Sequence, residues 1–168
     1  EKSFSVKGDA ILFGMGAIKD VGDGVSPIME EIKANGKFTS FRDYIRRAHK
    51  NKKVTEALID AGAFDCFGSN RKALKELFPR LAESIKKYNE KQEVITKCLE
   101  DKNRFIKLNN TDSKEFKAVE RRLNNAIEAR NNYENAFMTA KTSPISETLI
   151  ERLKAEKEKI GVYVSGHP

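Results

Sequence analysis

The sequence contains few of the residues that build metal centres. It has two cysteines and two histidines, and Cys66 and Cys98 lie far apart, with no other Cys or His at the spacing of zinc ligands. These counts argue against a structural zinc site. They predict two reduced thiols, which is the usual state of cysteine in a cytosolic protein.

Long apolar segments are also missing. No apolar run approaches the ~18 residues of a transmembrane helix, and residues 1–4 lack the apolar region of a signal peptide. Hydrophobic residues make up 39% of the chain and charged residues 34%, so the chain can bury a core but is highly charged. Because long solvated helices usually carry so many charges, we expect a mainly α protein. Since no signal peptide and no transmembrane segment are indicated, we expect it in the cytoplasm.

The residue patterns of common active sites are absent as well. Neighbouring carboxylates such as Glu156 and Glu158 are expected on a helix surface, with nothing to perturb them. The segment Ser165–His167 has no third partner for a catalytic triad. Residues 36–38, Gly-Lys-Phe, break the phosphate-binding Gly-Lys-Ser/Thr pattern. The sequence therefore nominates no catalytic residue and no metal-binding carboxylate cluster.

Positive charge is what the chain has in excess. The net charge is +7 and the pI is about 9.3, which favours a polyanionic partner such as nucleic acid. Seven cations against one acid, Asp43, lie in the stretch 37–53: Lys37, Arg42, Arg46, Arg47, Lys50, Lys52 and Lys53. Arg42, Arg46 and Lys50 are four residues apart and share one helix face. A solvated face is the alternative, but such faces usually mix signs, so phosphate contact is favoured.

The N-terminal segment is expected to form a short β-hairpin followed by tight turns. Phe4–Val6 and Ile11–Phe13 flank a turn-forming Lys-Gly-Asp sequence. Four glycines in the span from Gly14 to Gly24 exclude a long regular element there.

Three short helices are predicted next. Apolar residues at helix spacing begin at Val25 and end before Gly36, which fits the residue after a helix C-terminus. Ser40 is a candidate cap for the second helix, and Thr55 for the third.

The middle of the chain predicts two long helices. Apolar residues recur at heptad-like spacing over 74–106, interrupted by Pro79, which should kink or divide that helix. A second apolar stripe covers 116–137, after a break at 109–113. Two long helices with a short break should fold back on each other, which predicts an antiparallel helical hairpin over 81–140.

The C-terminal part predicts one more helix. Residues 146–159 form an amphipathic pattern, with Leu149, Ile150 and Leu153 on its apolar side. The apolar run at 161–164 is typical of the start of a strand.

Two glycine turns, each directly before a helix, carry the strongest chemical signal. A helix N-terminus presents unpaired N–H groups and the positive end of the helix dipole, and glycine allows close approach of a phosphate. The alternative is that these glycines only build turns and caps. Two such turns in a basic chain favour contact with DNA phosphates. The candidate residues are Lys19, Val21, Gly22, Asp23 and Gly24 in the first turn, and Gly68, Ser69, Asn70, Arg71 and Lys72 in the second.

Three blocks of sequence together resemble one protein family. They are residues 13–22 (FGMGAIKDVG), residues 56–65 (EALIDAGAFD) followed by Gly68 and Arg71, and residues 156–168 (EKEKIGVYVSGHP). Their order and spacing are similar to those of the bacterial C-family replicative polymerases, the DNA polymerase III alpha subunits. The resemblance covers 1–80 and 147–168, and the segment between is variable.

The resemblance implies a fold and a set of domains. Residues 1–80 would form tandem helix-hairpin-helix elements that hold duplex DNA by its backbone, without sequence preference. Residues 81–140, the helical hairpin predicted from apolar spacing, would be a variable insert that the resemblance does not map. Residues 141–168 would be a linker, a helix and the start of a strand leading to an OB-fold. At the first hairpin, Asp20-Val21-Gly22 stands where the motif usually has Gly-hydrophobic-Gly.

The resemblance also implies a role within a larger enzyme. The parent protein would be a DNA-directed DNA polymerase, a nucleotidyltransferase that uses Mg²⁺, whereas this segment would have no catalytic residue and no cofactor. Its partners would be double-stranded DNA and the rest of the polymerase chain. The family's sliding-clamp motif has only a poor match, at Glu134–Met138, so clamp binding stays open.

The alternative function is a protein-interaction or scaffolding module of the replisome that uses the helical hairpin. A small DNA-repair enzyme ranks last, because no catalytic residue set is present.

Overall fold

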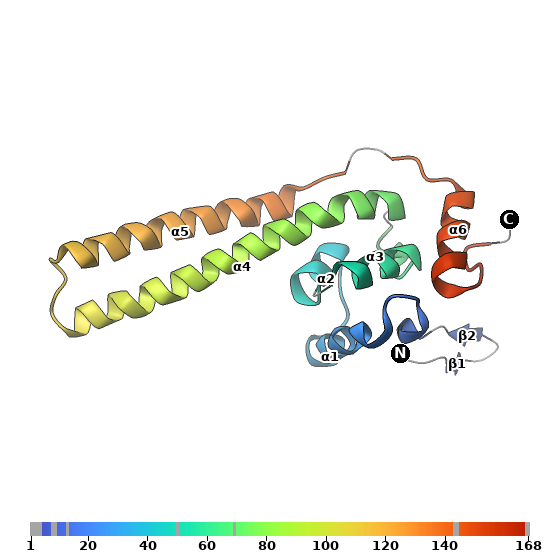
Figure 1. The fold of residues 1–168 in the computed structure, drawn as a ribbon, viewed down its shortest axis with the longest axis horizontal. Coiled ribbons are helices and arrows are strands. Elements are labelled where there is room, and N and C mark those ends of the chain that lie inside the picture. The colour runs from blue at the N-terminus through green and yellow to red at the C-terminus, as the bar shows by residue number, and fades with distance from the viewer. Residues whose placement is uncertain are drawn as a thin grey trace. The chain divides into compact units, whose positions relative to one another are not determined.

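The computed structural model describes residues 5–7, 10–12, 14–49, 51–68, 70–142 and 145–166. It is mainly helical (Figure 1). It falls into two compact units, one made of the described residues of Glu1–Pro79 and Lys141–Pro168, the other of Arg80–Ala140. In these described ranges, no helix combines the length and the apolar character needed to cross a membrane.

Two short strands precede the helices. β1 (Ser5–Lys7) pairs antiparallel with β2 (Ala10–Leu12), and Val6 lies opposite Ile11. Residues 4, 8–9 and 13 of the hairpin expected from the sequence lie outside the described residues. The N-terminal hairpin as a whole therefore stays a prediction.

The first unit consists of short helices joined by tight turns. Its elements are η1 (Met15–Ala17), η2 (Gly22–Gly24), α1 (Val25–Asn35), α2 (Phe41–Arg47), α3 (Lys52–Asp60), η3 (Asp65–Phe67), the start of α4 (Arg71–Lys107) and α6 (Leu149–Ile160). α1 ends at Gly36, which has φ 79°. α2 begins at Ser40, whose hydroxyl accepts from the Asp43 N–H at 3.1 Å. Both boundaries confirm the sequence prediction.

The start of α3 differs from the prediction. Its cap is Asn51, whose side chain accepts from the Lys53 N–H at 2.9 Å. Thr55, the predicted cap, lies inside α3 and is fully buried. Its hydroxyl shares hydrogen bonds with Tyr44 Oη at 3.0 Å and His49 Nδ1 at 2.9 Å. The Thr55 hydroxyl therefore finds its hydrogen-bond partners inside the core, where it links α3 to α2, and it does not cap α3.

The core of the first unit lies between α1, α2, α3 and the start of α4. Fully burying one large apolar side chain in this core contributes about 1.5–3 kcal/mol to the stability of the fold. The aromatic rings of Phe41, Tyr44 and Phe64 contact one another with centroids 4.8–6.2 Å apart. The most deeply buried side chains here include Val25, Tyr44, Ile45, Leu58, Ile59 and Phe78.

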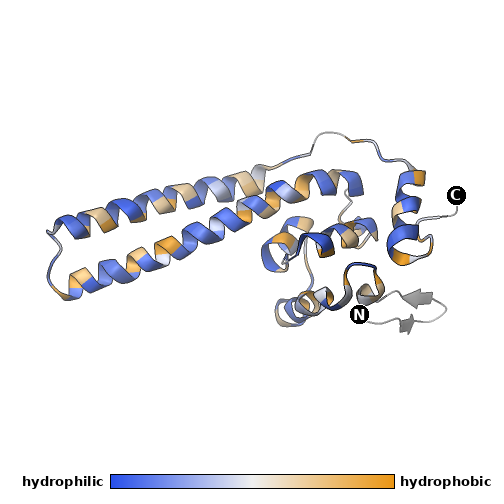
Figure 2. Cartoon of the chain, in the orientation of Figure 1, coloured by the Kyte–Doolittle hydropathy of each residue, from blue (hydrophilic) through white to orange (hydrophobic). Residues whose placement is uncertain are grey.

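The second unit is a helical hairpin made of α4 after Pro79 and α5 (Lys114–Thr139) (Figure 1). Pro79 lies inside α4 and does not divide it. The apolar contacts between the two helices include a cluster of four buried residues: Ile95, Cys98, Leu123 and Ala126. Along both helices hydrophilic residues predominate, with hydrophobic residues interspersed among them (Figure 2).

α6 buries a different side than the sequence indicated. Leu153 and Glu156 are its buried residues, whereas Leu149 and Ile150 are exposed. The prediction of a Leu149–Ile150–Leu153 apolar side is therefore wrong for its first two members. Among the described residues after α6, 161–166, there is no strand. The strand predicted at 161–164 is wrong as well.

Candidate nucleic-acid interface

The first candidate turn is a tight hairpin that leads into α1. The Val21 N–H donates to the Ile18 carbonyl at 3.1 Å, and the Gly24 N–H donates to the Val21 carbonyl at 2.8 Å. Asp20 and Gly22 have positive φ angles of 72° and 45°. Val21 is buried, so its side chain anchors the turn while the backbone around it stays near the surface.

Gly24 has a packing role in this hairpin. A Cβ atom there would lie 2.6 Å from Val54 Cγ2, closer than real Cβ contacts allow. Glycine at this position therefore lets the start of α1 approach α3. Gly22 differs, because a Cβ atom there would meet nothing within 4 Å, so its positive φ is the reason for glycine.

Asp20, which stands where the motif usually has glycine, has a charged partner. Its Oδ2 lies 2.7 Å from Nζ of Lys159 in α6, and that hydrogen bond lowers the pKa of Asp20 and raises the pKa of Lys159. The same part of α6 also receives a backbone bond, from the Lys19 N–H to the Lys159 carbonyl at 2.9 Å. The end of α6 thus offsets the negative charge of the turn and holds it in place.

The second candidate turn leads into α4. Gly68 adopts the left-handed conformation after η3, with φ 71°. The Asn70 side chain accepts from the Ala73 N–H at 3.1 Å, so Asn70 caps α4, and its amide donates to the Ile145 carbonyl at 3.3 Å. Lys72 is exposed and lies 3.2 Å from Glu151. Ser69 lies outside the described residues.

Arg71 is buried, although the sequence suggested a phosphate ligand. Only 4% of its surface is exposed. Its guanidinium lies 2.5 Å from Asp65 Oδ2 and 2.9 Å from Glu156 Oε1, and it donates to the Asp60 carbonyl at 3.0 Å. Both ionic partners belong to the same unit, so Arg71 joins the second hairpin to α6.

Glu156 completes this cluster. Its carboxylate is fully buried and accepts from the Val164 N–H at 2.7 Å, from the Ser165 N–H at 2.9 Å and from the Ser165 hydroxyl. Burial raises its pKa, but the hydrogen bonds from Ser165, Val164 and Arg71 outweigh burial and bring the pKa to about 2. The expectation that Glu156 is an unperturbed surface residue is wrong. The sequence did contain a signal for this cluster, because Arg71, Glu156 and Ser165 all lie within the blocks of family resemblance.

The basic face of α2 is partly used inside the unit. Arg47 lies 2.8 Å from Glu31 and 2.9 Å from Asp43, and it donates to the Gly36 carbonyl at 2.9 Å. It therefore ties α2 to the end of α1. Arg46 is exposed on the same helix and Arg42 is half-buried, whereas Lys50 lies outside the described residues.

A recess beside the first hairpin carries balanced charges. It has a volume of about 430 Å³ and is lined by Asp20, Lys53, Glu56, Asp60, Lys75 and Lys159. Within it Lys75 pairs with Asp60 at 2.5 Å and Lys159 pairs with Asp20 at 2.7 Å. Three acids against three lysines do not attract an anion. In the described part of the chain, no cluster of three or more His, Cys, Asp or Glu side chains could hold a metal ion.

Comparison with known proteins places this geometry in context. Residues 1–74 match a family model described as a helix-hairpin-helix motif. The chain is 34% identical to the DNA polymerase III subunit alpha of Chlamydia pneumoniae over 98% of its own length and 12% of that relative. It is 34% identical to the subunit of Borreliella burgdorferi over 99% of the chain and 13% of the relative. It is 33% identical to the subunit of Thermus aquaticus over 98% of the chain and 11% of the relative. The chain thus spans about an eighth of the length of these curated relatives.

Proposed function

The chain is homologous to one segment of the DNA polymerase III alpha subunit, and on that premise we propose that this segment binds the backbone of duplex DNA without reading its sequence. The observation that carries the proposal is the pair of tight hairpins, each ending at a helix N-terminus. The first leads into α1 and the second into α4. Two such turns can hold phosphates without any base contact.

The phosphate contacts are assigned to backbone groups and exposed cations. The backbone around Gly22 and Gly68 supplies the turns, with Lys19 exposed beside the first and Lys72 beside the second. The pair of Lys72 and Glu151 is exposed to solvent, and exposed ion pairs contribute little to stability, so Lys72 can exchange its partner for a phosphate. Arg47 and Arg71 are left out of the contact set, because their guanidinium groups hold the unit together.

The role in the whole polymerase follows from the same premise. This segment positions duplex DNA, whereas nucleotidyl transfer and the Mg²⁺ that it requires belong to other parts of the parent chain. The rest of the polymerase is therefore its permanent partner. Binding of this segment is expected to contribute affinity rather than sequence choice.

A second candidate is docking of a replisome protein on the helical hairpin. The observation that favours it is the exposure of Ile106 and Leu108 at the end of α4 and just beyond it. The two functions differ in their dependence on salt. Phosphate contacts lose affinity with a log–log slope of about −0.9 per phosphate on duplex DNA, and an apolar contact does not.

The test is fluorescence anisotropy of the 168-residue chain with a short random-sequence duplex over a salt series. We expect binding at low salt that falls steeply with salt and does not change with sequence. Gly22→Ala should weaken binding, because Ala strains a positive φ in the turn that contacts phosphate. Gly36→Ala is the matched control, since Gly36 also has a positive φ and open space around it but ends α1.

Equal losses in the two variants would assign the effect to stability and contradict the hairpin contact. Absence of binding by the unmodified chain at low salt would contradict the proposed function itself.

A further inference from the structure

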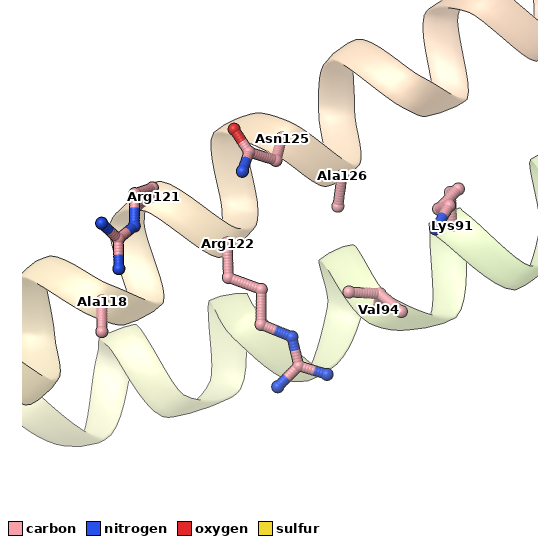
Figure 3. A pocket seen from close by; sticks show the side chains of 7 residues that line it. All are labelled: Lys91, Val94, Ala118, Arg121, Arg122, Asn125 and Ala126. Carbon is pink, nitrogen blue, oxygen red and sulfur yellow. The ribbon is translucent and has the colours of Figure 1, made fainter.

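A recess in the second unit has charges unlike those of the recess beside the first hairpin. It lies between α4 and α5, has a volume of about 410 Å³, and three of its lining residues are cationic (Figure 3). None of its lining residues is acidic. The lining consists of Lys91 and Val94 from α4, and of Ala118, Arg121, Arg122, Asn125 and Ala126 from α5.

The sequence of α5 places the polar lining on one face. Ala118, Arg121, Arg122 and Asn125 follow at helix spacings of three and four residues, so they lie side by side. Figure 3 shows the Arg122 side chain extending from α5 toward α4. Ala126 belongs to the buried cluster of the hairpin, and Val94 packs against that cluster. The cations therefore surround an apolar, well-packed base, where their field is screened less than in open water.

The other cations of the hairpin give the relevant contrast. Lys102 lies 2.8 Å from Glu120, Lys87 lies 3.2 Å from Glu90, and Arg104 lies 3.7 Å from Asp101. Within the described hairpin, no carboxylate forms an ion pair with Lys91, Arg121 or Arg122. Three neighbouring cations without an acid repel one another, and an anion in the recess would relieve that repulsion.

We propose that this recess binds phosphate groups of a nucleic-acid backbone, as a second contact that is independent of the two hairpins of the first unit. The guanidinium groups of Arg121 and Arg122 can each donate two hydrogen bonds to phosphate oxygens. Lys91 adds a point charge and the Asn125 amide a neutral donor. Arg121, Arg122 and Ala118 are exposed, so the mouth is open, which suits a passing strand better than an enclosed small nucleotide.

The main test is double charge reversal in the 168-residue chain. Arg121→Glu/Arg122→Glu should reduce the steepness of the salt dependence of duplex binding by about 1.8, because each lost phosphate contact removes about 0.9 from the slope. Lys86→Glu/Lys107→Glu is the matched control, with the same charge change at exposed cations of the hairpin outside the recess. Equal changes in both double variants would show general electrostatics and overturn the proposal.

A proximity measurement tests the site without relying on affinity. In a Cys66→Ser background, Ala118→Cys carrying a photo-crosslinker should crosslink to the bound duplex, since Ala118 lines the recess. Asn124→Cys is the control, because Asn124 is exposed on α5 but does not line the recess. Failure of the Ala118 probe to crosslink, or equal crosslinking from both positions, would overturn the proposal.

Two further arms separate the possible outcomes. Inorganic phosphate, compared with chloride at equal ionic strength, should not displace the duplex from the recess. If millimolar phosphate abolished the Ala118 crosslink, the site would be one for free phosphate and not for a strand. If Gly22→Ala left binding unchanged while Arg121→Glu/Arg122→Glu reduced it, the hairpin function would fail and the recess would stand.

Discussion

The two units use charged residues in opposite ways. In the first unit, Arg71 and Glu156 are buried together and fix the second hairpin against α6. In the helical hairpin, the buried cluster is entirely apolar, and cations such as Arg121 and Arg122 are exposed. A cation near a glycine turn is therefore not by itself a sign of phosphate binding, because in this chain one of them builds the turn.

The largest expected effect comes from breaking the buried pair in the first unit. Glu156→Ala leaves Arg71 with a single carboxylate partner and removes the acceptor of the Val164 and Ser165 amides. Removing one partner of a buried pair typically costs about 3–5 kcal/mol. We expect a loss of that size in urea unfolding, with backbone hydrogen exchange accelerating in α3 and α6 but not in α5.

The matched control is Glu158→Ala, because Glu158 lies two residues further on the same helix and is exposed. Its effect should stay within about 0.5 kcal/mol. Comparable losses in the two variants would mean that the polar cluster does not stabilise the first unit, and the contrast between the units would disappear.

The second effect is acid sensitivity confined to the first unit. The folded-state pKa of Glu156 is about 2, below its ordinary value of 4.5, so its stabilisation is fully present above pH 4.5 and is lost as the pH falls from 4.5 toward 2. A pKa shift of this size corresponds to a contribution on the order of 3 kcal/mol to the free energy of unfolding. The carboxyl groups of Asp20, Glu31, Asp43 and Glu151, whose pKa values are also lowered, lie in the same unit.

Hydrogen exchange followed over this pH range measures the difference. Protection in α3 and α6 should fall below pH 4.5, while protection of the residues around Leu123 in α5 should change less. A simultaneous loss in both units would show one cooperative structure and would contradict a separate acid response.

These contacts also show which parts of the structure could be predicted from the sequence. Local signals worked: Gly36 ended α1, Ser40 capped α2, and helix spacing located α4 and α5. Local signals failed where a distant partner decided the outcome. Arg71 and its hydrogen-bond partner Ser165 are separated by 94 positions, and no periodicity relates them.

The candidate site follows the same division. The left-handed residue of the first hairpin could be anticipated, because Asp tolerates that conformation better than most residues, and Asp20 has φ 72°. Its neutralisation by Lys159 could not, because it depends on how α6 packs. The recess at Arg121 and Arg122 was missed for a related reason: a charge-balanced segment gave no signal until the two helices were placed side by side.

The smallest expected effect compares two helix caps, one in each unit. Asn70 caps α4, and Ser113 caps α5 by accepting from the Phe116 N–H at 3.1 Å. Replacing either by Ala should cost about 1 kcal/mol in urea unfolding. Asn70→Ala should cost more than Ser113→Ala, because it also leaves the Ile145 carbonyl without its donor.

Asn70→Asp separates the two contributions of Asn70, since Asp keeps the capping oxygen and loses the amide that reaches Ile145. Its stability should lie between the unmodified chain and Asn70→Ala. In duplex binding, Asn70→Asp is expected to be weaker than Asn70→Ala, because a negative charge beside the second hairpin repels phosphate and Ala does not. If Asn70→Asp bound duplex DNA as well as the unmodified chain, the second turn would be a structural cap alone, and DNA contact in the first unit would rest on the hairpin before α1.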